Sequence, residues 1–365
     1  MNDSEDCNDG ILNLTNPLDA ENILYTQTED LMYSVGLPLI AFVGVSSNTA
    51  FIFVVFRVKS MQTITNAYLT NLSATDLIFV ALSCGFSITN YTKSPVRDEI
   101  MFNSWVGCTT SWFVVLTTYF ASLMIITLVT VEKYYALCHP LQHMMVSGKG
   151  RTIKLLTISW LIGTVLGLVT ALRYPAFKRL CAIWPDIDKF DTMPELIEYC
   201  RPLSQTMWVV SDSVLVVPFF AVFVCSMYMY TRIIMALGSR PTGEKLDDIS
   251  SAAASQALQA VRVRNQVARL LIINGMIFFC CQAPLRLVQV HNIWEAITAT
   301  RFMTTAQHGG LTVISRGLLL INSCINPFVY YASSSFYRSA FRQAFCVNSK
   351  STQQHSAVTM TSVDK

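Results

Sequence analysis

Charged side chains are scarce in this sequence. Of its 365 residues only 13% are Asp, Glu, Lys or Arg, whereas 52% are hydrophobic. A soluble domain carries about twice that charged fraction, so the composition excludes an ordinary soluble protein. Seven apolar runs, each longer than the roughly 20 residues that span a bilayer, instead predict an all-α membrane protein. The runs lie at residues 34–57, 66–90, 106–138, 153–173, 205–237, 266–294 and 310–332.

Basic residues are absent from the first 33 positions, which contain eight acidic side chains. The connections after the first, third and fifth runs have the opposite character, and their basic residues are Arg57, Lys59, Lys149, Arg151, Lys154, Arg240, Lys245, Arg262 and Arg264. Cytoplasmic connections of membrane proteins are enriched in Lys and Arg. We therefore expect a multi-pass protein of the plasma membrane with an extracellular N-terminus.

The spacings typical of enzymes and transporters are also missing. No Ser/His/Asp, Cys/His or metal-ligand pattern recurs on one face, and the five His are dispersed. A transporter or channel would show inverted repeats and several charges along a path through the membrane, which this sequence lacks. We predict that the protein is not an enzyme, and we expect no nucleic-acid partner.

Polar residues and a proline interrupt the last of the apolar runs. The stretch SRGLLLINSCINPFVYY at 315–331 interrupts an apolar helix with Asn322, Asn326 and Pro327. In lipid a proline frees the backbone carbonyl four residues upstream, and polar groups nearby must satisfy it. Asp76 in the second run also costs several kcal/mol unless it is paired, hydrated or protonated. We expect both stretches to face protein rather than lipid.

Single residues in a fixed order along the runs form a specific set. They are Asn48, Asp76, Trp105, Cys108, Trp160 and the sequence NPFVY at 326–330. In order and spacing this set resembles the rhodopsin-like (class A) family of G-protein-coupled receptors, over nearly all of residues 34–346. The resemblance implies a bundle of seven transmembrane helices.

The last apolar run is followed by a stretch of different character. Residues 333–346 repeat aromatic side chains at helical spacing together with Arg338 and Arg342, which predicts a short amphipathic eighth helix in contact with membrane lipid. The tail that follows is rich in Ser, Thr and Gln and is predicted to be disordered. The predicted organisation is an acidic segment at 1–33, the bundle at 34–332, the interfacial helix at 333–346 and the tail at 347–365.

Three positions are candidates for covalent modification. Asn2 and Asn13 begin Asn-x-Ser/Thr triplets on the predicted outer side and are expected glycosylation sites. Cys346 follows the predicted interfacial helix, where a palmitoyl anchor and an unmodified thiol both fit.

The resemblance implies one metal ion and one disulfide. A sodium ion would bind in the inactive state, because a buried carboxylate needs a cation or a proton. No other cofactor is expected. The implied disulfide joins Cys108 to Cys200, leaving Cys181 and Cys7, although four cysteines can pair in three ways. The implied sodium ligands are Asp76, Ser122, Asn322, Ser323 and Asn326.

The end of the third run aligns with the family's DRY sequence. Lys133 stands where the family has arginine, and lysine keeps the charge but loses the planar fork of five donors. We therefore expect weakened contacts to a heterotrimeric G protein. A lysine that only reaches for the membrane interface is the alternative. The residues assigned to coupling are Glu132, Lys133, Tyr134 and Tyr330.

The implied ligand pocket departs from several receptor groups. Val115 stands where the family's amine receptors keep an aspartate, which disfavours an amine ligand. Gln282 replaces the tryptophan that usually lies beneath the ligand, and Leu116 replaces a tyrosine. Arg286 and Arg316, with the run MQTITNAYLTNLSATDL, resemble the thyrotropin-releasing-hormone receptors, in which two arginines contact a small amidated peptide. Arginines that only cap helices or tie loops are the alternative. The residues assigned to the pocket are Val115, Leu116, Tyr119, Gln282, Arg286 and Arg316.

These observations together favour a receptor for an extracellular neuropeptide. By resemblance it signals through a G protein of the Gq class with calcium release, and arrestin is a further expected partner. Two alternatives remain open at this point. One is a receptor-fold protein with weak or no G-protein coupling, and the other is a receptor for a different peptide or a lipid.

Overall fold

The computed structural model describes residues 9–97, 99, 104–146, 148–171, 176–238 and 252–345. Side chains at 146, 252–264 and 305–306 fall outside that description. The same holds for several positions singled out above, namely Asn2, Cys7, Cys346 and the tail at 347–365.

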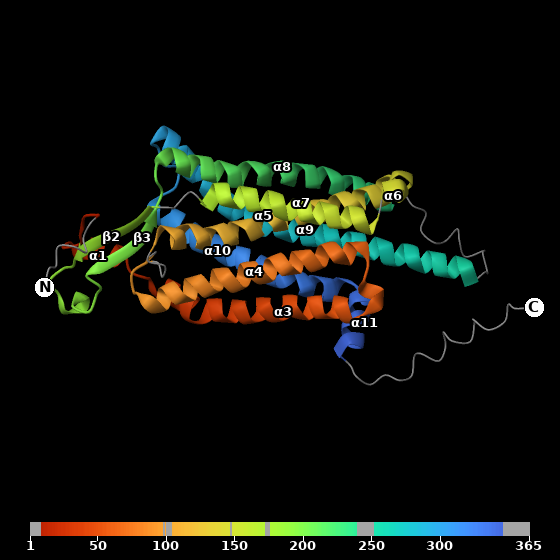
Figure 1. Ribbon diagram of the computed structural model, residues 1–365, viewed down its shortest axis with the longest axis horizontal. Coiled ribbons are helices and arrows are strands. Elements are labelled where there is room, and N and C mark those ends of the chain that lie inside the picture. The colour runs from red at the N-terminus through yellow and green to blue at the C-terminus, as the bar shows by residue number, and fades with distance from the viewer. Residues whose placement is uncertain are drawn as a thin grey trace, which may run out of the picture.

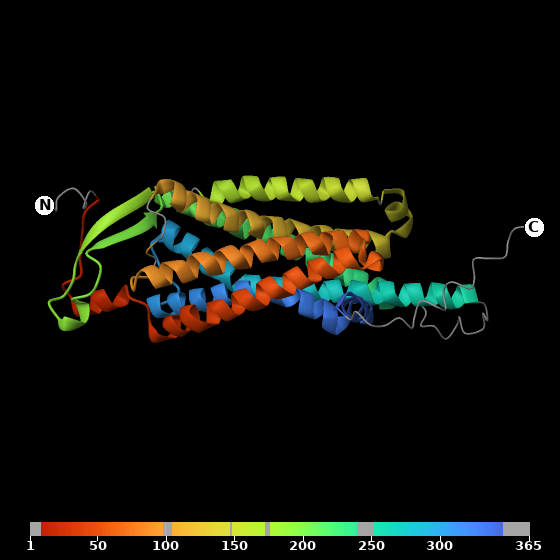
Figure 2. The same ribbon diagram turned by 60° about the horizontal axis from the view of Figure 1, so that its bottom comes forward.

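Among the described residues, seven helices are long and apolar enough to cross a membrane, which confirms the predicted all-α bundle. They lie side by side along one axis (Figures 1 and 2). The short helix α11 (Ser335–Phe345) follows the last of them, as predicted. The seven are α3 (Leu37–Arg57), α4 (Ile64–Lys93), α5 (Trp105–Cys138), α7 (Lys149–Ala171), α8 (Gln205–Gly238), α9 (Ala252–Thr298) and α10 (Thr305–Ser333).

The first span begins earlier than the apolar run predicts. Helix α2 (Gln27–Leu31) continues through a π-helical turn at Met32–Gly36 into α3, so the span starts at Gln27 instead of residue 34. A capping box begins it: the Glu29 backbone N–H donates to the Thr26 hydroxyl, and the Thr26 N–H donates to the Glu29 carboxylate. This Thr-x-x-Glu pattern is visible in the sequence. The acidic residues around it lower the local hydrophobicity, so the apolar run predicted from the sequence does not include this helix.

A three-stranded sheet stands at one end of the bundle (Figure 1). The strands are β1 (Ile11–Asn13), β2 (Ala176–Ile183) and β3 (Leu196–Arg201), in the order β1-β2-β3. β1 runs parallel to β2, whereas β2 and β3 form an antiparallel pair. The N-terminal segment, which includes α1 (Pro17–Asn22), is therefore folded against the connection between α7 and α8. We call this end of the molecule the sheet end and the opposite one the α11 end.

The sheet has a small apolar core of its own, separate from that of the bundle. The Asp9 carboxylate fastens β1 to β2, because it accepts hydrogen bonds from the Lys178 ammonium and the Arg179 backbone N–H. These contacts hold the acidic N-terminal segment in place through charge and apolar packing together. The buried residues of this core are Leu14, Ala20, Val96, Ala182, Phe190 and Ile197.

Two glycines let α7 pack closely on α5. Gly163 and Gly167 are four residues apart and share one helix face. A Cβ atom on Gly167 would lie 2.8 Å from the Thr117 backbone nitrogen. A Cβ atom on Gly163 would lie 3.0 Å from the Thr117 backbone oxygen. Small residues at such contacts allow two transmembrane helices to approach each other.

Substitution at Gly167 tests this contact. We expect Gly167→Ala to destabilise the fold by about 1–3 kcal/mol, because the added methyl meets backbone that cannot move aside. The measurement is thermal unfolding of the purified protein in detergent. Gly85→Ala in α4 is the matched control, since nothing lies within 4 Å of the added methyl. Equal melting temperatures for the two variants would contradict the close contact.

Two acids at the sheet end are buried, Glu198 on β3 and Glu99 in the connection between α4 and α5. Glu198 is buried and pairs with Arg179 at 3.0 Å and Lys93 at 3.5 Å. Glu99 is only 6% exposed. Burial raises the pKa of the Glu99 carboxyl above its ordinary value of 4.5, and the charge of Glu198 raises it further, whereas a Ser94 hydrogen bond and Lys93 lower it.

The raised pKa of Glu99 predicts a pH-dependent effect of Glu99→Gln. Ionisation of the buried carboxyl opposes folding, so its cost is absent below pH 4.5 and grows as the pH rises through the pKa of the folded state. We therefore expect Glu99→Gln to raise the melting temperature at pH 7 more than at pH 4.5. Glu195→Gln, at an exposed position, is the control. A stabilisation that is the same at both pH values would contradict the assignment.

Candidate functional site

The polar residues of α3, α4 and α10 meet inside the bundle. Asp76 is 2% exposed, and its carboxylate accepts a hydrogen bond of 2.6 Å from the Asn326 amide. Pro327 leaves the backbone carbonyl of Ser323 without its helical donor. The Asn48 amide donates to that carbonyl at 2.8 Å. The structure thus supplies the polar partner that a proline in a transmembrane helix requires.

The five residues assigned to a sodium site offer the oxygen atoms that a hard cation prefers. The structure brings Asp76, Ser323 and Asn326 into contact. Ser122 of α5 and Asn322 of α10 are buried as well. Within the described residues the Asn322 side-chain oxygen has no hydrogen-bond partner. This orphaned oxygen and the buried carboxylate fit a cation.

A buried arginine lies at the centre of the predicted pocket. Arg286 is 3% exposed, and its guanidinium donates to the side-chain oxygens of Gln289 at 2.6 Å and Gln282 at 3.3 Å. Its central carbon lies 4.5 Å from the Tyr119 ring centroid and 5.9 Å from that of Phe219. The structure therefore joins three predicted residues, Tyr119, Gln282 and Arg286, through hydrogen bonds and cation–π contact.

Gln289 and Phe219 are pocket residues that the sequence analysis missed. Gln289 is three residues after Arg286 on the same helix, so helical spacing could have identified it. Phe219 belongs to α8, and only the packing of α8 on α9 brings it to Arg286. No signal in the sequence links these two positions.

Two donor groups of this pocket have no acceptor among the described residues, namely the Arg286 Nε–H and the Tyr119 hydroxyl. The buried Asp212 of α8 acts on Arg286 through its charge. Within the described ranges no ion pair shorter than 4.0 Å joins the two. Across the described residues two hydrogen-bond donors at this site are therefore buried and unsatisfied in this conformation.

Two further predicted pocket residues, Val115 and Leu116, contribute apolar side chains. Val115 and Leu116 are half-buried on α5, about one helical turn before Tyr119. Among the described residues no hydrogen bond joins them to Arg286, and Leu116 packs against the apolar cluster that contains Tyr119 and Phe219. They are placed to line the pocket but do not share the Arg286 network.

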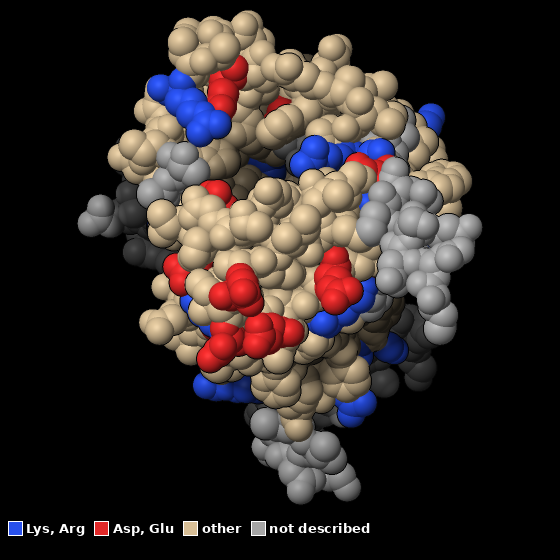
Figure 3. Space-filling model, turned by 90° about the vertical axis from the view of Figure 1, so that its left-hand side faces the viewer, with Lys and Arg blue, Asp and Glu red and all other residues tan. Residues whose placement is uncertain are grey.

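Arg316 of α10 is exposed. Ile314 and Ile321 are exposed too and mark the outward face of this helix. Arg316 is two residues beyond Ile314, which is about 200° around the helix, so it points to the inner side of the bundle. Figure 3 looks onto the sheet end and shows a hollow with basic side chains at its rim and within it. Among the described side chains no hydrogen bond or ion pair joins Arg316 to Arg286.

At the α11 end Glu132 and Lys133 bind different partners. The Glu132 carboxylate lies 2.6 Å from His143 Nε2 on α6 (Pro140–Val146), and the Lys133 ammonium donates to the Thr65 hydroxyl at 2.5 Å. In the described part of the chain these two neighbours form no ion pair with each other. Each instead ties α5 to another element at this end.

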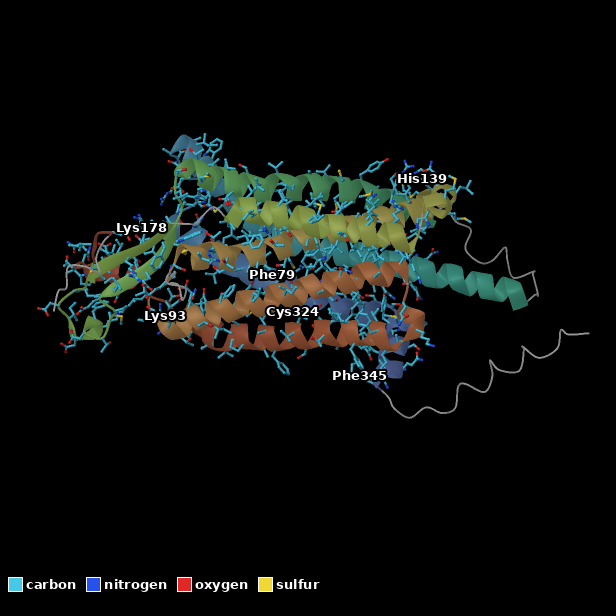
Figure 4. The ribbon with its side chains drawn as sticks, viewed as in Figure 1. Phe79, Lys93, His139, Lys178, Cys324 and Phe345 are labelled. Carbon is cyan, nitrogen blue, oxygen red and sulfur yellow. A yellow bond between two sulfur atoms is a disulfide. The ribbon has the colours of Figure 1, made fainter. Side chains whose placement is uncertain are left out.

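The two predicted coupling tyrosines have different surroundings. The Tyr134 hydroxyl lies 3.2 Å from His139 Nε2 at the end of α5, far from Lys93 at the sheet end (Figure 4). Tyr330 is completely buried and packs on Tyr337 of α11. In this conformation Tyr330 is enclosed by the bundle and does not lie at the surface.

Tyr230 of α8 is a further residue that sequence reasoning did not assign. Its hydroxyl lies 3.1 Å from that of Thr130 on α5. Gly275 of α9 makes room for it, because any Cβ atom there would collide with the Tyr230 hydroxyl. Tyr230 therefore connects three helices near the α11 end.

A disulfide joins Cys108 at the start of α5 to Cys200 of β3, as the resemblance implied. Cys181 is also disulfide-bonded, and Cys7 lies outside the described residues. Asn13 is exposed on β1, at a position that a glycan could reach.

Comparison with known proteins yields one matching family. The family model described as "7 transmembrane receptor (rhodopsin family)" matches residues 47–330. Bombesin receptor subtype-3 from Ovis aries is 25% identical over 306 residues, which cover 83% of this chain and 72% of the relative. The tachykinin-like peptides receptor 86C from Drosophila melanogaster is 25% identical, over 86% of this chain and 58% of its own. Neuromedin-U receptor 2 from Rattus norvegicus is 23% identical, over 86% of this chain and 74% of the relative.

Proposed function

Because the chain belongs to the rhodopsin family of seven-transmembrane receptors, we propose that it binds a peptide and activates a heterotrimeric G protein. The family is not enzymatic, and its members are multi-pass proteins of the plasma membrane. The observation that carries the peptide ligand is the set of relatives, which are named for bombesin, tachykinin-like peptides and neuromedin U.

In this proposal the sheet end is extracellular. It holds the acidic N-terminal segment and the Cys108–Cys200 disulfide, and disulfides form in oxidising compartments. Arg57 ends the first span on the opposite side and Lys59 follows it, as expected of a cytoplasmic connection. The hollow at the sheet end in Figure 3 is then the entrance for the ligand.

The ligand contacts we propose are Arg286 and Arg316. Arg286 offers a free Nε–H donor inside the pocket, and Arg316 lies on the inner side of α10 in an exposed position. A guanidinium binds carbonyl and carboxylate oxygens through charge-assisted hydrogen bonds. Resemblance to the thyrotropin-releasing-hormone receptors makes small amidated peptides the first ligands to test.

Coupling is proposed at the α11 end, to a G protein of the Gq class with calcium release. Arrestin would use the same end, while α11 lies against membrane lipid. A receptor-fold protein with weak coupling is the second candidate. The Lys133–Thr65 hydrogen bond favours it, since a lysine held by α4 lacks the donor fork that arginine would offer to a G protein.

The proposed ligand contacts predict a specific loss of potency. Amidated peptides would be screened on cells that express the chain, with calcium as the readout. Once an agonist is known, Arg286→Ala or Arg316→Ala should cost about 2–5 kcal/mol in binding, or about thirtyfold to several thousandfold in affinity, because the ligand's acceptor is left unpaired. Arg342→Ala on α11 is the matched control and should bind normally. Unchanged affinity at normal surface level would remove both arginines from the ligand site.

We also propose that a sodium ion binds at Asp76. When bound, it would neutralise the buried carboxylate and favour the inactive receptor. We expect sodium to weaken agonist binding to the parent protein. Asp76→Asn should abolish that effect, because the variant lacks the carboxylate that would bind the ion. Sodium would be exchanged for choline at constant ionic strength. Agonist affinity that ignores sodium in the parent would argue against an ion at this position.

A further inference from the structure

Two histidines meet between α9 and α10 at the sheet end. His291 is 1% exposed, and His308 is half-buried at the start of α10. Their ring centroids are 5.4 Å apart. They come from the two helices that carry Arg286 and Arg316, but neither belongs to the proposed ligand site.

The charged groups that face this pair are Glu295 of α9 and Arg301 of the loop between the helices. His291 Nε2 lies 3.6 Å from the Glu295 carboxylate, which Arg301 also binds. The other ring nitrogen of His291, Nδ1, is buried without a hydrogen-bond partner among the described residues. His308 Nε2 lies 2.8 Å from the Asn292 side-chain oxygen. We call His291, Glu295, Arg301 and His308 the histidine junction.

Protonation changes the contacts of this junction. Histidine is the side chain that ordinarily changes its charge between pH 5 and 8. A charge on His308 would be only partly solvated, and it would face Arg301 beside the His291 ring at 5.4 Å. Partial burial and the charge of Arg301 both oppose this charge while the junction is closed, so protonation of His308 favours release of α10 from α9.

We propose that the histidine junction holds α9 and α10 together at neutral pH and opens on mild acidification. Arg286 lies five residues before His291, about 7.5 Å along α9, and Arg316 lies eight residues after His308, about 12 Å along α10. Opening therefore alters the separation of the two helices that carry these arginines. The proposal concerns the helix ends themselves and does not depend on the proposed function.

Hydrogen exchange tests it without any ligand. The purified full-length chain in lipid nanodiscs would be compared at pH 7.5 and pH 6.0, after correction for the chemical exchange rate. If opening lets one histidine with the ordinary pKa of about 6.5 take up a proton, the equilibrium constant for opening rises at most about fourfold between these pH values. Amides of 287–312 should therefore lose up to about fourfold protection. Amides of 117–131 in the centre of α5 should not respond.

Substitution of His308 identifies the titrating group. His308→Gln keeps a side-chain amide near Asn292 but cannot gain a charge. This variant should make the protection of 287–312 independent of pH. His143→Gln at the α11 end is the matched control and should keep the parent's response. Equal protection of the parent at both pH values would overturn the proposal, and so would a response that persists in His308→Gln.

Discussion

A backbone carbonyl in lipid must find a donor, and Pro327 removes the one that would meet the carbonyl of Ser323. Asn48 of α3 supplies it at 2.8 Å, while Asn326 donates to Asp76 of α4 at 2.6 Å. These two hydrogen bonds join three helices inside the bundle, where an unsatisfied polar group would cost the most free energy. The arrangement of α3, α4 and α10 depends on them.

The same principle explains the difference between the two ends of the molecule. At the sheet end Arg286 is buried against an aromatic ring and two glutamine side chains, with one donor left without an acceptor. At the α11 end Lys133 and Glu132 are each bound to another element. Among the described residues the sheet end therefore keeps an unsatisfied donor at Arg286, whereas Lys133 and Glu132 at the α11 end both have partners on other elements.

Residues that follow a local rule were recognised from the sequence, and those that depend on packing were not. The proline with its polar neighbours, the small set of ordered motif residues and the amphipathic α11 all carry short-range patterns. Gln289 lies within one helical turn of Arg286, so its role was accessible but overlooked. Phe219 and Tyr230 act through helices distant in sequence, and no spacing along the chain reveals them.

By itself the sequence determined the seven spans and the need for internal partners at Asp76 and Pro327, because the bilayer limits helix length and leaves no water to satisfy polar groups. The tertiary structure alone decided which side chains meet. It placed Tyr119 beneath Arg286 and turned Lys133 to Thr65. It also paired β1 with β2 across about 170 residues of chain, since strand pairing depends on long-range contacts that have no local signature.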